Sequence, residues 1–336
     1  MDTSIVESLL RPMYRVVLRT VERARVATMR ARGTSGEPVV VLGSPRSGTS
    51  WLMRLIARPP GYCTIFEPLH HRWWPEARAV GFGGRPWEAD ERQRVYLEQV
   101  FRGEKGRRSI RKPRWSEEVG GNPVRLVRGA IKRIRADRLV VKFVRACRLL
   151  PWLIDAFPNC RYVYIVRNPY AVVSSQLSRG ASSYLDDRPV PYDYLNADRQ
   201  SGAVVEALCD RIRADAAQVL GKAVVQDIDS LEAGLALAWY ADNLIAQEAA
   251  AGSEAVCTVR YENLLTHTDS ELRGIQEHVG AETSFAAGVD VKNPQRQLQK
   301  WRRHLSERQV ETIQTVLDAL QDEYGALQWV GGCPGD

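Results

Sequence analysis

The chain has 336 residues, of which 44% are hydrophobic and 26% charged, and its formal net charge is +7. This composition fits a large globular protein, and the sequence contains no recognisable repeat and no low-complexity tract. The chain contains no run of 18 apolar residues, no compact signal sequence, and no CxxC or metal-site spacing among its six cysteines. We therefore expect a reduced cytoplasmic protein, with peripheral membrane contact left open, and no metal.

The first 36 residues are predicted to form an amphipathic basic helix followed by a tether. Apolar residues recur at helical spacing, and arginines follow an i, i+4 stripe at positions 11, 15, 19 and 23. Three roles fit such a helix: lying on an anionic membrane, binding a second subunit, or covering the domain's own apolar surface. The glycine- and serine-containing segment 32–36 is typical of a flexible linker.

The segment 38–51, PVVVLGSPRSGTSW, predicts a buried strand over residues 38–43, a loop, and then a helix. The loop keeps the glycine spacing of a phosphate-binding loop, but Thr49 replaces the usual lysine and the cation is Arg46. The N–H groups of Ser47, Gly48, Thr49 and Ser50, at the helix start, are suited to a diphosphate-like anion. A purely structural turn is the alternative.

Four more strands are expected over residues 62–66, 139–144, 161–166 and 256–260, with intervening segments long enough for helical crossovers. This pattern predicts an α/β fold: a P-loop-like, doubly wound sheet of about five parallel strands flanked by helices. We expect one domain over residues 37–330, with helical insertions and a short tail over 331–336. Lys142 interrupts an apolar strand, so it either reaches a ligand or carboxylate or extends to solvent; Lys112 is a further basic candidate.

The fourth predicted strand ends at Arg167, and Asn168-Pro169 then begins a helix that carries Ser175. Arg167 and Ser175 lie about two helical turns apart at the carboxyl edge of the sheet, where ligands bind in open parallel sheets. They can therefore converge on one ligand. A solvated strand end is the alternative for a lone arginine.

The paired segments SPRSGTSW and YIVRNPYAVVSS resemble the two cofactor signatures of sulfotransferases that use 3′-phosphoadenosine 5′-phosphosulfate (PAPS). The segment FEPLHH further resembles a loop of the carbohydrate sulfotransferases, and looser likeness extends over most of residues 38–330. The resemblance implies that the first signature binds the 5′-phosphosulfate, while Arg167 and Ser175 bind the 3′-phosphate. It also implies that 3′,5′-adenosine bisphosphate is the product and that no metal is needed.

Roles for further residues follow from the same resemblance. Arg46 is expected to stabilise charge on the departing 5′-phosphate, because arginine stays protonated and cannot donate a proton. Glu67 is the expected general base, with His70 as the rival. Trp51 matches a position that stacks adenine, although packing into the core explains it equally well.

A late basic segment completes the cofactor site in many family members, and this likeness offers Lys300 and Arg302 as cofactor contacts. Here the segment departs from the better-known glycine-containing version. It precedes an amphipathic helix that is expected to begin near Leu305-Ser306.

The leading functional hypothesis is sulfuryl transfer from PAPS to a hydroxyl of a carbohydrate, a glycosylated metabolite or another small-molecule alcohol. A P-loop kinase or nucleotide hydrolase is the second hypothesis, and a non-catalytic anion or nucleic-acid binder is the third. The third draws on residues 102–148, which hold sixteen Lys or Arg and four Asp or Glu. We expect no nucleic-acid partner, because no nucleic-acid-binding module is recognisable.

Overall fold

The structure is a computed structural model that describes residues 16, 20–21, 23–29, 31, 33, 36–70, 74–82, 88–105, 134–144, 146–179, 202–221, 228–286, 288–291 and 293–327. Several predictions lie outside these residues: those on the first turns of the chain, Lys112, most of the basic block, and the tail 331–336. Within the described ranges, no helix has both the length and the apolar character that a membrane span requires.

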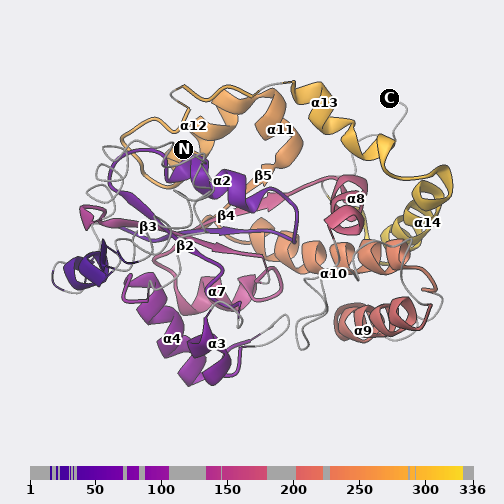
Figure 1. Ribbon diagram of the computed structural model, residues 1–336, viewed down its shortest axis with the longest axis horizontal. Coiled ribbons are helices and arrows are strands. Elements are labelled where there is room, and N and C mark those ends of the chain that lie inside the picture. Colours follow the sequence, from indigo (N-terminus) through magenta and orange to yellow (C-terminus); the bar gives the residue numbers. More distant parts are fainter. Residues whose placement is uncertain are drawn as a thin grey trace, which may run out of the picture.

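A five-stranded parallel sheet forms the centre of the molecule, in the order β2-β3-β1-β4-β5 (Figure 1). The predicted strands are confirmed to within one residue: β1 Val39–Leu42, β2 Tyr62–Phe66, β3 Arg138–Phe143, β4 Arg161–Val166 and β5 Val256–Arg260. Strand β1 is buried at all four positions, since it pairs with β3 on one side and β4 on the other. Apolar, β-branched residues suit a strand that is covered on both faces.

Helices cover both faces of the sheet, as a doubly wound fold requires. Val39 and Val41 of β1 pack in one cluster with Leu52 and Leu272, whereas Val40 and Leu42 belong to the cluster on the other face. The first face is covered by α2 Thr49–Ile56, α11 Tyr261–Thr266 and α12 Thr268–His278. The other face is covered by α3 Pro75–Ala79, α4 Glu91–Phe101, α7 Leu150–Ala156, α8 Pro169–Arg179 and α10 Leu231–Ala251.

The carboxyl-terminal half adds helices around α10, whose residues are buried over most of its length. Helix α10 packs against α9 Gly202–Leu220 and α14 Glu307–Tyr324, and α13 Pro294–Leu298 and the 3₁₀ turn η4 Lys300–Arg303 precede α14. Buried Arg148 ties this region to the sheet, because it bonds Asp242 of α10 at 2.9 Å and Asp215 of α9 at 2.8 Å.

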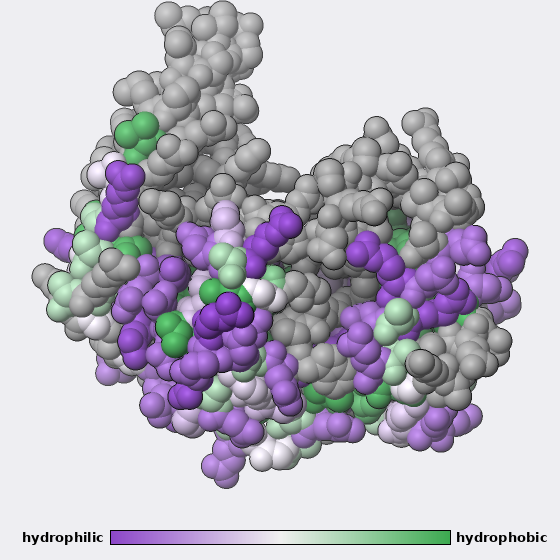
Figure 2. Space-filling view, turned by 90° about the horizontal axis from the view of Figure 1, so that it is seen from below, coloured by the Kyte–Doolittle hydropathy of each residue, from purple (hydrophilic) through white to green (hydrophobic). Residues whose placement is uncertain are grey.

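Seen from below, the described surface is mainly hydrophilic, with small separate hydrophobic patches (Figure 2).

The described residues between 16 and 31 of the amino-terminal segment are helical. Val21, Arg25 and Met29 are buried, and the Arg25 guanidinium lies 3.7 Å from the Cys63 sulfur of β2. This part of the helix therefore contacts the domain's own core, the third of the roles considered for it.

Candidate functional site

The segment after β1 is a tight loop whose two glycines leave no room for a side chain. A Cβ atom on Gly43 would lie 2.4 Å from the carbonyl oxygen of Ile165 in β4. Gly48 has a φ of 100°, in the left-handed region that favours glycine, and a Cβ atom there would lie 2.5 Å from the Tyr261 ring. The glycines therefore allow close contact between the loop and the neighbouring strand ends.

The loop leads into α2, and the main-chain N–H groups of a first helical turn have no acceptor within the helix. The helix dipole adds positive potential at the same place. The structure changes the expected donor set, because the N–H of Ser47 donates to the carbonyl of Ser44 at 3.1 Å. The two serine hydroxyls also bond each other at 2.6 Å, and Thr49 is buried. The amides of residues 48–50 are the remaining candidates for an anion.

Arg46, Arg167 and Ser175 come from two different strand-to-helix units and meet beside this loop. Arg46 has a φ of 75°, and its Nε donates to the Ser175 hydroxyl at 3.0 Å. Arg167, directly after β4, donates from Nη1 to the carbonyl oxygen of Arg46 at 3.0 Å. The structure thus brings both arginines and the serine together at the carboxyl edge of β1 and β4.

The Nε of Arg167 is buried and has no hydrogen-bond acceptor among the described residues. A buried donor without an acceptor costs roughly 1 to 3 kcal/mol, and more for a charged group. An anionic ligand would supply the acceptor. The arginines, the Ser175 hydroxyl and the α2 amides therefore supply several anion-binding donors along this edge of the sheet.

Two aromatic rings line the same region. The Arg167 guanidinium lies 4.2 Å from the centre of the Tyr261 ring, which is within cation–π range. The Tyr261 ring meets Trp51 edge-on, with ring centres 5.7 Å apart. Trp51 is half-buried, with part of its surface packed against Tyr261 in this contact.

Glu67 follows β2 at the same edge of the sheet and is 2% exposed. It adopts a φ of 50°, and its Oε2 accepts the N–H of Val144 at 3.0 Å. Its Oε1 forms an ion pair with Lys142 of β3, which is itself buried and lies 4.0 Å from the centre of the Phe66 ring. Lys142 therefore reaches a carboxylate and does not extend to solvent. Strand β3 separates Glu67 from the loop after β1, a spacing of about 10 Å for two strand intervals.

A sequence profile of the sulfotransferase family matches residues 38–223, more than half of the chain. The chain belongs to the sulfotransferase family. It is accordingly a sulfotransferase enzyme, and the family implies an acceptor substrate. A search of curated proteins found no significant match.

Solved structures similar to this sulfotransferase include one from Alicyclobacillus acidocaldarius, at 16% identity and a TM-score of 0.40, covering 88% of this chain and 98% of that one. A mouse sulfotransferase complexed with PAP shows 14% identity and a TM-score of 0.39, covering 89% of each chain. A Mycobacterium avium sulfotransferase shows 14% identity and a TM-score of 0.38, covering 87% and 78%.

Other predicted residues of this sulfotransferase lie around the same edge. His70 is half-buried, and its N–H donates to the carbonyl of Glu67 at 3.0 Å, which closes the turn after β2. Lys300 and Arg302 are exposed on η4, where Trp301 between them stacks on Tyr170 at 4.9 Å. The structure brings η4 beside the start of α8, whereas the predicted cofactor contacts of Lys300 and Arg302 remain a prediction.

Tyr261 and Glu262 begin the helix after the fifth predicted strand, and no role was predicted for them from the sequence. Glu262 Oε1 accepts the N–H of Asn168 at 3.1 Å, directly after Arg167. Burial raises the pKa of Glu262, while the Asn168 N–H, Arg167 and Arg260 act in the opposite direction. The position of Tyr261 and Glu262 after a strand was the signal in the sequence for a site role. Their contact with the end of β4 was not predictable, because it depends on β5 lying beside β4.

Proposed function

We propose that this sulfotransferase transfers the sulfuryl group of PAPS to a hydroxyl group of a carbohydrate, glycosylated metabolite or other small-molecule alcohol. The meeting of Arg46, Arg167 and Ser175 beside the start of α2 is the observation that carries the proposal. PAPS has phosphate groups at both ends of its ribose. A site for it needs two separate groups of anion-binding donors.

The residues present fit such a ligand. The amides at the start of α2 and the Arg46 side chain suit the 5′-phosphosulfate, because oriented N–H groups and a fixed cation stabilise anions. Arg167 and Ser175 suit the 3′-phosphate, and the unpartnered Arg167 Nε supplies a donor for it. The Tyr261 and Trp51 rings provide apolar surface beside these donors.

PAPS supplies the sulfuryl group. Side chains of this protein stabilise the negative charge on the departing phosphate and accept the proton of the acceptor hydroxyl. Arg46 stabilises negative charge on the departing phosphate oxygen, and as a permanently charged group it does so without giving up a proton. Glu67 accepts the proton of the acceptor hydroxyl. Its Oε1 pairs with Lys142, and a carboxylate oxygen has a second lone pair that can accept that proton.

Calorimetric titration with 3′,5′-adenosine bisphosphate and with adenosine 5′-monophosphate tests the assignment. The wild-type protein should bind the bisphosphate more tightly, because only this ligand carries a 3′-phosphate. Arg167→Ala should weaken bisphosphate binding about tenfold or more, the value of a lost charge-assisted hydrogen bond, and should leave the monophosphate nearly unchanged.

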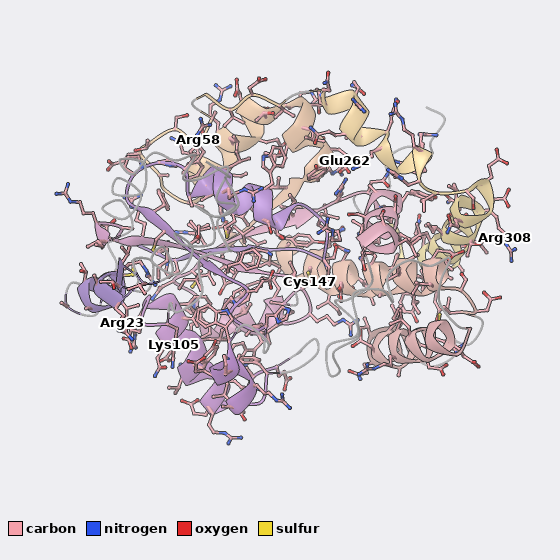
Figure 3. All side chains as sticks on the ribbon, in the orientation of Figure 1. Arg23, Arg58, Lys105, Cys147, Glu262 and Arg308 are labelled. Atoms are coloured by element: carbon pink, nitrogen blue, oxygen red, sulfur yellow. The ribbon has the colours of Figure 1, made fainter. Side chains whose placement is uncertain are left out.

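Arg308→Ala is the matched control, since Arg308 is exposed on α14, away from the β1 loop (Figure 3). It should leave both affinities at wild-type values. Equal weakening of both ligands by Arg167→Ala would contradict the 3′-phosphate assignment. Preferential binding of magnesium-ATP would favour the kinase hypothesis, and binding of an oligonucleotide alone would favour the non-catalytic one.

A further inference from the structure

The short junction between β5 and α11 contacts the side chain of Arg167 and the main-chain N–H of the next residue, Asn168. Tyr261 lies under the Arg167 guanidinium at 4.2 Å, and the next residue, Glu262, accepts the N–H of Asn168 at 3.1 Å. Figure 3 labels Glu262 near the start of α11, close to α8. Tyr261 and Glu262, which follow the edge strand β5, therefore hold the segment Arg167-Asn168 that follows the neighbouring strand β4.

The Asn168 N–H belongs to the peptide unit that joins Arg167 to Asn168. Because a peptide unit is planar, the direction of this N–H fixes the backbone dihedral ψ of Arg167. Asn168 is followed by Pro169, which has no N–H, and the Asn168 side chain accepts the N–H of Ala171 at 3.2 Å. The Asn168 N–H is thus a main-chain donor of this turn that the neighbouring α11 holds.

We propose that Glu262 is a positioning residue that orients Arg167 through the Asn168 N–H and thereby sets the affinity for the 3′-phosphate. This inference rests on the proposed function. It assigns Glu262 no contact with the cofactor, and it makes the acceptor oxygen of Glu262 more important than its charge. Removing the charge should not weaken binding, since a carboxylate beside an anion site opposes the incoming phosphate.

Two variants separate the effect of the length of the Glu262 side chain from the effect of its charge. Glu262→Gln keeps the length of the side chain and a carbonyl oxygen for the Asn168 N–H, but it loses the charge. Glu262→Asp keeps the charge but is one methylene shorter, so it cannot hold the same N–H without movement of the backbone. A carboxylate that is merely structural would not change the preference for a ligand with a 3′-phosphate over one without it.

The experiment measures the ratio of affinities for 3′,5′-adenosine bisphosphate and adenosine 5′-monophosphate in both variants, with thermal melting to establish that each is folded. Glu262→Asp should lower the ratio about tenfold, the value of one lost hydrogen bond at a charged site, and Glu262→Gln should keep it within about twofold. Glu271→Asp is the control, because this α12 carboxylate accepts from the side chain of Asn263.

A wild-type ratio retained in folded Glu262→Asp would overturn the inference, and so would an equal loss in Glu262→Gln, while the proposed function would stand. A wild-type protein that does not distinguish the two ligands would overturn the proposed function and this inference together.

Discussion

Arg46 and Glu67 share an unusual backbone conformation. Among the described residues, the non-glycine residues with positive φ are Arg46 at 75°, Glu67 at 50° and Asn293 at 51°. Such conformations cost on the order of 1 kcal/mol or more each, and they persist where the surrounding structure fixes them, often at functional sites. The two side chains proposed to act on the leaving phosphate and the acceptor hydroxyl are thus both held by strained backbone.

Glu67→Gln should lower kcat by roughly 10²- to 10⁴-fold, because it keeps the shape of the side chain and removes the proton acceptor. Binding of 3′,5′-adenosine bisphosphate should stay close to wild type. Steady-state kinetics and calorimetry measure the two quantities. His70→Ala should have the smaller effect on kcat. A nearly inactive His70→Ala together with an active Glu67→Gln would make His70 the base and Glu67 a residue that orients it.

Contacts between residues of one sequence motif were predicted better than contacts between residues that are distant in sequence. Arg167 and Ser175 lie on one strand-to-helix unit, so their spacing alone indicated convergence. The pairing of Lys142 with Glu67 was left open, because it depends on β3 lying beside β2. The hydrogen bond between Glu262 and the Asn168 N–H was missed, because it requires β5 to lie beside β4.

At the scale of the elements, Gly48 connects the loop after β1 to α2 and lies against Tyr261 of α11. Gly48→Ala should destabilise the protein by about 1 kcal/mol or more, since alanine at a φ of 100° is strained and its Cβ would meet the Tyr261 ring. Cofactor affinity should fall as well, because the ring and the loop must move apart. Thermal melting and calorimetry check both effects. Ser50→Ala, in the first turn of α2, keeps the main-chain N–H; it is the control and should melt as the wild type does.

Helix α12 provides a pH-dependent contribution to stability. Its last residue, His278, contacts the carbonyl oxygen of Tyr162 at 3.1 Å, and burial lowers its pKa below the ordinary value of 6.5. The unfolded chain therefore binds a proton more readily than the native protein, so stability falls as pH drops below about 6.5. Melting temperatures between pH 5 and 8 should show a smaller acid-side loss in His278→Gln than in wild type. An unchanged slope would contradict this assignment.

The elements were largely predictable from local patterns. Apolar runs located all five strands, and the predicted amphipathic helix near residue 305 is α14, which begins with a capping box between Ser306 and Gln309. The strand order was not predictable, since apolar runs of similar composition carry no information on which strands become neighbours. The family resemblance suggested cofactor contacts on η4, but the packing of its Trp301 on Tyr170 did not follow from that resemblance.

At the scale of the whole molecule, turnover should persist in excess EDTA. Thr49 occupies the place of the phosphate-loop lysine, and the arginines supply fixed positive charge at the proposed phosphate positions, so no cation is required to neutralise the ligand. Assays with PAPS and a panel of alcohol acceptors, with and without EDTA, test this. Loss of turnover in EDTA that magnesium restores would favour the kinase hypothesis.

The position of β1 at the centre of the sheet also affects how the protein is made. Both partners of β1 lie far downstream, so the strand leaves the ribosome long before β3 is synthesised from residue 138 onwards. At about 5 to 20 residues per second, this interval lasts roughly 5 to 20 s. During it, an apolar strand has two open edges, which is the kind of segment that aggregates or binds chaperones. Efficient production of this enzyme should therefore depend on chaperone capacity during translation.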